Sequence, residues 1–290
     1  MDFHQIYRPL TAHPFRSNAQ YREYEPCEEL KPYIRCFWGS FMPYRQYKAM
    51  EPMQDIVIPD TCMDIIFTVD YTGNQLFGKF CGIDDRTFIT CHEGDEERDV
   101  SIFAIRFYPW SAFLFAEESM RGTRNGFFEA GVHFFGLQKE MESLLFDVAG
   151  IKERIPIAER YLLSRIRLER NRTVFVDALF KILKQKGNVE IGRLSKEVHA
   201  SDRQIERIFQ ENMGISPKRF SSLVRYQYLW NDVLFSARFQ AADAVCRYGY
   251  ADQSHMLHDF KRFHTMNPET ARNYARSEWE RQRILGLTNL

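Results

Sequence analysis

The feature that most limits how this chain can fold is a repeat of about 51 residues in its last third. The segment SDRQIERIFQENM begins at Ser201, and the segment DQSHMLHDFKRFH begins at Asp252. Their alignment places Phe209 on Phe260, and each segment is followed by a proline suited to the first turn of another helix. A short helix, a tight turn and a helix capped by serine or aspartate are typical of a helix-turn-helix unit. The repeat therefore predicts two such units.

Apolar periodicity and helix-ending residues predict an all-helical domain over residues 173–290. The two units are expected at about 190–213 and 241–263, and a long helix over 217–235 would connect them. If this helix separates the two recognition helices by one turn of DNA, about 34 Å, both can enter major grooves on one face of the duplex.

The second helix of each unit carries polar side chains opposite its apolar face. Arginine suits guanine or phosphate, glutamate suits cytosine and glutamine suits adenine. The alternative interpretation of this polar face is a solvated surface without a ligand. The candidate DNA contacts of the first unit are Ser201, Asp202, Arg203, Glu206, Arg207 and Gln210. Those of the second unit are Gln253, Ser254, Leu257 and His258. Lys218, Arg225 and Lys261 are candidate phosphate contacts, for which solubility is the alternative.

A metal site is a competing interpretation of the second unit. His255 and His258 are three residues apart on one predicted helix, with His264 beyond, and histidines at this spacing share a face. The sequence suggests no nearby third ligand, and the repeat already accounts for the segment. We expect neither a metal nor a cofactor.

The distribution of charge differs between the two halves of the chain, although the formal net charge is zero. Residues 1–172 hold 21 Lys and Arg against 26 Asp and Glu, and residues 173–290 hold 18 against 13. A basic C-terminal part is suited to a polyanion such as double-stranded DNA.

The first 115 residues or so contain short β-branched and aromatic runs separated by Pro, Gly, Asp and Asn, which predict strands of a small barrel or sandwich. Helical spacing returns at about 136–168, and the polar stretch 167–172 is the expected boundary. The fold class predicted is α+β, with an N-terminal domain over 1–170 and the helical domain over 173–290.

Four residues of the N-terminal part are candidate effector contacts: Trp38, Asp64, Arg106 and Trp110. Tryptophans can line a pocket for an apolar or cationic ligand, although most are expected in the core. Arg106 stands between apolar neighbours in a predicted strand and needs a partner if it points inward, and Asp64 is the expected one.

Composition limits the setting in which the chain works. No stretch approaches the roughly 18 apolar residues of a membrane span, and the first residues lack a secretory pattern, so we expect a cytoplasmic protein without a membrane. Six cysteines without a CxxC pair are expected to be mostly reduced. The histidines before residue 136 show no metal-ligand spacing, so an enzyme is not expected.

The C-terminal third resembles the AraC/XylS family of transcriptional regulators, through RLSKEVHASDRQIERIFQENMGISPKRFSSLVR and RYGYADQSHMLHDFKRFHTMNPETAR. The resemblance covers roughly residues 175–275. Departures from the family pattern are His199 and Thr265 at positions where glycine is common, Trp230 for a small residue and His258 for an arginine.

The N-terminal part is similar to cupin-like sensory domains of this family, through IPDTCMDIIF at 58–67 and FAIRFYPWSAFLF at 103–115. The resemblance implies a sequence-specific DNA-binding regulator, controlled by a small-molecule effector bound in the β domain, with RNA polymerase and a second copy of the chain as expected partners. Two alternatives stay open: an N-terminal domain that serves only as a dimerisation scaffold, and a cupin-type enzyme.

Overall fold

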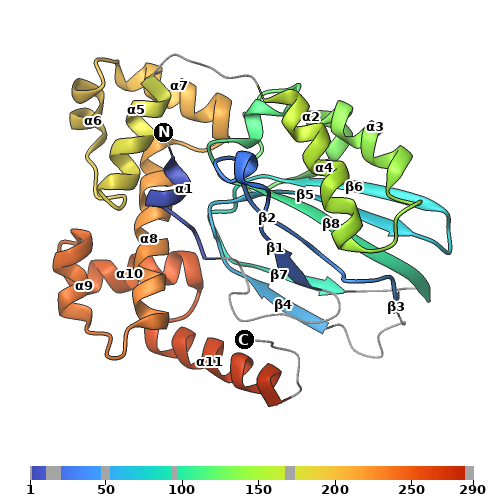
Figure 1. Cartoon of the computed structure of the whole chain (residues 1–290). Coiled ribbons are helices and arrows are strands. Elements are labelled where there is room, and N and C mark those ends of the chain that lie inside the picture. Colours follow the sequence, from blue (N-terminus) through green and yellow to red (C-terminus); the bar gives the residue numbers. More distant parts are fainter. Residues whose placement is uncertain (1, 11–20, 47–52, 93–96, 167–173, 285–290) are drawn as a thin grey trace.

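The chain folds into an N-terminal antiparallel β-sheet domain and a C-terminal helical region (Figure 1). The structure is a computed structural model that describes residues 2–10, 21–46, 53–92, 97–166 and 174–284. The predicted α+β class is confirmed, and the predicted boundary at 167–172 lies outside the described residues.

Strands form within the first 115 residues or so, where the β-branched and aromatic runs of the sequence predict them. The strands are β1 (Arg22–Tyr24), β2 (Ile34–Gly39), β3 (Tyr44–Gln46), β4 (Met53–Val57), β5 (Met63–Asp70), β6 (Gln75–Cys81), β7 (Phe88–His92), β8 (Arg98–Phe107) and β9 (Phe127–Glu129). The sequence missed β1, β3 and β9, each of three residues. Because β9 pairs with β6, the sheet continues past the predicted limit near residue 115.

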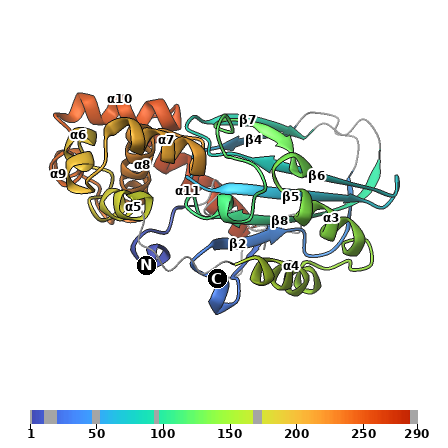
Figure 2. The ribbon, with the colours of Figure 1, turned by 90° about the horizontal axis from the view of Figure 1, so that it is seen from above.

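One sheet has the order β1-β2-β8-β5-β6-β9, with β3 also paired to β8, and β4 pairs with β7 in a second sheet. Among the described strands, β1 and β9 end the ladder of the larger sheet. Figure 2 shows β4 and β7 over one side of the larger sheet and α4 (Ile151–Arg165) on the other side.

Helices cover the apolar face of the larger sheet. Phe80 of β6 lies 4.9 Å, centroid to centroid, from Phe134, which precedes α3 (Phe135–Leu144). Helices α3 and α4 correspond to those predicted at 136–168. The short helices of this domain are α1 (Phe3–Ile6), η1 (Glu28–Leu30), η2 (Ala112–Leu114) and α2 (Ala130–His133).

The helical region contains the helices that apolar periodicity and helix-ending residues predict. Its helices are α5 (Val174–Lys184), α6 (Ile191–Glu197), α7 (Asp202–Met213), α8 (Pro217–Phe235), α9 (Ala241–Tyr248), α10 (Gln253–His264) and α11 (Pro268–Ile284). No helix in the described part of the chain is long and apolar enough to cross a membrane.

The two segments of the sequence repeat, which form α7 and α10, are also alike in how their helices are capped and in which residue is buried. The Ser201 hydroxyl accepts from the Gln204 amide at the start of α7, and the Asp252 carboxylate accepts from the His255 amide at the start of α10. Phe209 and Phe260 are both fully buried. Gly214 and Thr265 end the two helices in the left-handed conformation, with φ of 69° and 66°.

The sheet domain contacts the helical region at several polar points. The Thr87 hydroxyl donates to the carbonyl of Phe263 in the last turn of α10. Gln227 of α8 donates to the carbonyl of Pro59 over 2.6 Å, and Arg219 pairs with the buried carboxylate of Asp85. The two parts also share a hydrophobic core, so the interface combines apolar packing with specific hydrogen bonds.

A buried histidine occupies the core of the second unit. The Nδ1 atom of His264 lies 2.8 Å from the hydroxyl of Tyr226, and its ring centroid lies 4.4 Å from that of Trp230. Trp230, which departs from the family pattern, therefore fills space beside this ring. Burial lowers the pKa of His264 to about 4.

We predict that His264 makes stability depend on pH. In the unfolded chain its pKa is near 6.5, so the unfolded state binds a proton more readily, and stability is lost as pH falls from about 6.5 towards 4. Between pH 7 and pH 5 this histidine should lower the free energy of unfolding by about 2 kcal/mol. The replacement His264→Met introduces the residue that the first unit has at the equivalent position, Met213. Denaturant unfolding of the wild type and of this variant at both pH values measures the difference in pH dependence. Equal pH dependence of both proteins would refute the prediction.

Candidate nucleic-acid interface

Helix α7 presents a polar face to solvent because its apolar residues point into the first unit. Ile205, Phe209 and Met213 are buried, whereas Asp202, Arg203, Glu206 and Arg207 are exposed and Gln210 is half-buried. The N-terminal cap at Ser201 and the left-handed Gly214 fix where the helix begins and ends. The candidate contacts of the first unit thus lie on one accessible helix.

The polar side chains of α7 differ in how they are already engaged. Arg207 pairs with Glu211 at 2.9 Å, and the Gln210 amide donates to Glu206 over 3.2 Å. Among the residues that the structure describes, no side chain pairs with Arg203. Arg203 is therefore the cation of this helix that can bind DNA without giving up an existing ion pair.

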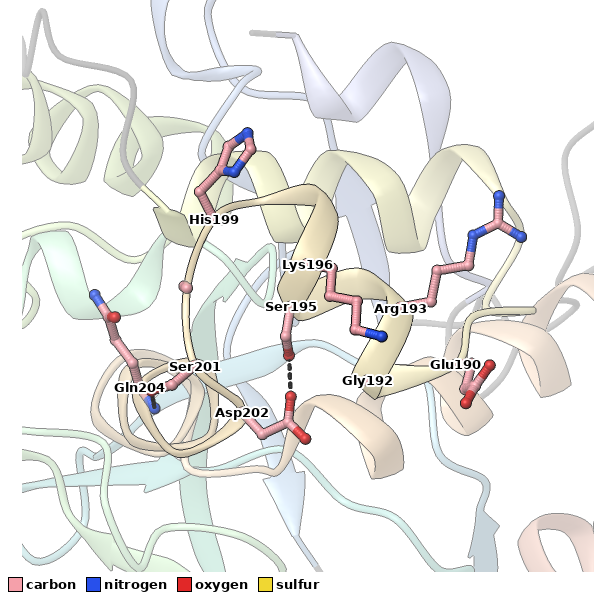
Figure 3. Close-up of a pocket in the computed structure, with 10 residues that line it drawn as sticks. Glu190, Gly192, Arg193, Ser195, Lys196, His199, Ser201, Asp202 and Gln204 are labelled. Carbon is pink, nitrogen blue, oxygen red and sulfur yellow. Dashed lines mark hydrogen bonds between the residues drawn. The ribbon is translucent and has the colours of Figure 1, made fainter.

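A groove of 670 Å³ lies between α6 and the start of α7 (Figure 3). Figure 3 shows the Ser195 hydroxyl donating to the carboxylate of Asp202, which ties the two helices together. Arg193, Lys196 and His199 also line the groove, and sequence reasoning did not single them out as contacts. Arg193 and Lys196 lie on the first helix of the unit and His199 lies in the turn that follows it, and this position was the signal that could have identified them. His199, like Thr265, has a positive φ, of 54°.

Helix α10 presents the second set of candidate contacts. Gln253, Ser254, His258 and Lys261 are exposed, while Leu257 is half-buried against the core. These side chains lie on one helix whose start is capped by Asp252. A base contact by any of them stays a prediction.

The candidate phosphate contacts of α8 occupy two different environments. Lys218, near the start of the helix, is exposed. Arg225 is half-buried, with its guanidinium 2.9 Å from Asp259 of α10 and 4.3 Å from the ring centroid of Tyr250. Arg225 thus holds α8 against the second unit, and its contact with phosphate stays a prediction.

The three histidines of the second unit do not converge. His264 is buried beside Tyr226, whereas His255 and His258 are exposed. Within the described ranges, no group of three or more His, Cys, Asp or Glu side chains could hold a metal ion.

In the sheet domain, the predicted pair of Arg106 and Asp64 is confirmed. Cross-strand pairing places Cys36, Arg106, Asp64 and Cys81 in one row, on the face opposite to that of Phe80. The Arg106 guanidinium donates to both carboxylate oxygens of Asp64, over 2.9 and 3.0 Å. The Trp38 indole donates to the same carboxylate over 3.0 Å.

Trp110 lies apart from the other three candidate effector residues. Its indole donates to the carbonyl of Pro32 over 3.0 Å, and its ring stacks on Tyr108 with centroids 4.6 Å apart. These contacts make Trp110 part of the packing at the end of β8, and within the described part of the chain no contact joins it to the Arg106 pair.

Further acidic groups surround the Arg106 pair. The Nη1 atom of Arg106 is buried, has no hydrogen-bond partner among the described residues and lies 3.6 Å from Asp60. Burial raises the pKa of Asp60, and burial together with the neighbouring Asp60 and Asp64 raises the pKa of Asp84 to about 7. Sequence reasoning missed Asp60 and Asp84 because they lie in loops whose packing has no local pattern.

Comparison with known proteins agrees with this geometry. Residues 194–274 match the family described as Helix-turn-helix domain, and residues 22–128 match Domain of unknown function (DUF6597). No curated protein matches the sequence.

Solved structures that match this chain include ToxT from Vibrio cholerae, at 12% identity over 80% of this chain and 96% of that one, with a TM-score of 0.37. Another is unsaturated fatty acid bound wild-type ToxT, at 12% identity over 90% and 96% of the two chains, with a TM-score of 0.33. Similarity this low does not establish a shared ligand site.

Two capped helix-turn-helix units on one long helix, together with the match over residues 194–274, define a protein of the DNA-binding class. The C-terminal part is an AraC-type helix-turn-helix domain, so the resemblance of the C-terminal third to this family is confirmed.

We predict that Asp64→Ala destabilises the protein by about 3–5 kcal/mol, because it leaves the guanidinium of Arg106 buried without its main partner. The matched control is Asp99→Ala, which breaks the exposed pair with Arg45 and should cost less than about 1 kcal/mol. Denaturant unfolding measures both variants. Equal losses would show that burial of the Arg106 pair does not govern its contribution.

Proposed function

We propose that the protein is a sequence-specific DNA-binding transcriptional regulator. The observation that carries this proposal is the pair of recognition helices, each capped at its start and exposed along its polar face. The connecting helix α8 has 19 residues and is therefore about 28 Å long, comparable with one turn of DNA. Both helices would enter major grooves on the same side of the duplex.

The proposal treats residues 1–170 as a sensory domain and residues 173–290 as the DNA-binding domain. Support for effector control comes from two loops of the sheet domain. Asp60 and Asp84 lie beside the Arg106 pair, and their chain neighbours Pro59 and Asp85 bond to α8. A ligand that displaces either loop would therefore shift the helical region.

Two other functions compete with effector control. In the first, the sheet domain is only a dimerisation scaffold. If so, no small molecule should raise the melting temperature of the full chain. In the other it is a cupin-type enzyme, which metal analysis of the purified protein would reveal. A homodimer, contact with RNA polymerase and a cytoplasmic location stay predictions from the sequence.

We predict that Arg203→Ala lowers the affinity for the operator by roughly 1–3 kcal/mol, mainly through base pairs beneath the first unit. The physical reason is that Arg203 is exposed and has no partner within the described structure, so its guanidinium is available to a base or a phosphate. Electrophoretic shift with the DNA upstream of the gene measures the loss. Lys139→Ala, on α3 of the sheet domain, is the matched control, and an Arg203→Ala protein that binds every probe like the wild type would contradict the assignment.

We predict that Lys218→Ala weakens binding to all sequences alike. A lysine that neutralises one phosphate releases about one counterion, so the slope of log K against log salt should fall by about one. Affinities measured over a salt series give this slope. An unchanged slope would remove Lys218 from the interface.

A further inference from the structure

A loop of the sheet domain caps the C-terminal end of the first recognition helix. The amide of Met120 donates to the carbonyl of Glu211 over 2.9 Å, and the Ser119 hydroxyl donates to the same carbonyl over 3.2 Å. Carbonyls in the last turn of a helix have no partner within the helix, so this loop, residues 119–124, supplies one. We call it the capping loop.

Gly214 makes this close approach feasible. A Cβ atom at this position would lie 2.5 Å from both the Met120 carbonyl oxygen and the Thr123 hydroxyl oxygen, which is nearer than such atoms approach in proteins. The capping loop is therefore held against the end of α7 by the backbone of Met120 together with the short side chains of Ser119 and Thr123.

The capping loop also carries an arginine beside the exposed face of α7. A groove of 570 Å³ is lined by Arg121, Ser201, Arg203, Gln204, Glu206, Arg207 and Gln210. Arg121 is the one residue of this lining that comes from the sheet domain. Its side chain is 59% exposed, and its guanidinium is 3.7 Å from the carboxylate of Glu211, a weak surface pair.

We propose that Arg121 binds a backbone phosphate of the DNA beside the first recognition helix, so that the sheet domain forms part of the DNA interface. This inference rests on the proposed function. A helix in the major groove is flanked by phosphates, and a guanidinium at the side of that helix meets the backbone rather than the bases. Three arginines against Glu206 and Glu211 leave the groove with a net positive charge that suits one phosphate.

The anchoring of the capping loop makes this contact differ from an ordinary surface arginine. The loop backbone is already held on α7, so binding has to order only the side chain of Arg121. The same backbone contacts place the arginine in a constant register with the bases that α7 contacts.

The test compares full-length wild type, Arg121→Ala, Arg121→Lys and the control Lys139→Ala. Each protein is titrated with a mixed-sequence duplex of roughly 40 base pairs, long enough for both units, over a salt series. We expect Arg121→Ala to lose about one unit of salt slope, so that the advantage of the wild type is about fourfold larger at 50 mM than at 200 mM salt. Arg121→Lys should keep the slope, and Lys139→Ala should match the wild type.

Thermal unfolding separates this role from a structural one. Because Arg121 is mostly exposed, its substitution should leave the melting temperature unchanged. An Arg121→Ala protein with the wild-type slope, with tighter binding or with a lowered melting temperature would overturn the inference. If Arg203→Ala weakens binding while Arg121→Ala does not, only this inference fails, whereas a wild type without salt-dependent binding refutes the proposed function itself.

Discussion

The arrangement of this protein depends on hydrogen bonds from the sheet domain to the carbonyl ends of both recognition helices. The carbonyl of Glu211 accepts from the capping loop, and the carbonyl of Phe263 accepts from the hydroxyl of Thr87. Since the C-terminal ends of α7 and α10 are held by the sheet, their capped N-terminal ends at Ser201 and Asp252 remain exposed. The sheet domain thus fixes the orientation of the two helices while leaving accessible the ends that would read DNA under the proposed function.

Under the proposed function, this attachment offers a route from the sheet domain to the helical region. The buried charges around Arg106 continue along the chain into the contacts with α8: Asp60 follows Pro59, and Asp84 precedes Asp85. A carboxyl whose pKa is near 7, as for Asp84, changes charge at little cost when its surroundings change. Asp84 is followed directly in the chain by Asp85, the residue that pairs with Arg219 of α8. Packed interiors transmit such shifts instead of absorbing them.

Sequence reasoning succeeded where the determining physics is local. The caps at Ser201 and Asp252 and the buried Phe209 and Phe260 follow from spacing along one helix, and the confirmed pair of Arg106 and Asp64 follows from the cost of burying a lone charge. Arg121 carries no such local signal, because its place beside α7 is set by a contact between residues about 90 positions apart in the chain. The same holds for the clamp of Arg225 on Asp259 and for three-residue strands such as β9, which are too short to show a period.

The residue that ends the recognition helix differs between the two units, and the contacts of the sheet domain with each helix account for this difference. Gly214 and Thr265 both end a recognition helix at positive φ, which an L-residue with a side chain adopts at a cost of roughly 1–2 kcal/mol. At Gly214 a backbone loop also comes within a distance that no Cβ would allow, so glycine is required. At the second unit the sheet domain contacts the end of the helix through the hydroxyl of Thr87, which donates to Phe263, and Thr265 itself is exposed. Glycine is therefore kept where the close approach demands it, and the unit without that approach accommodates threonine.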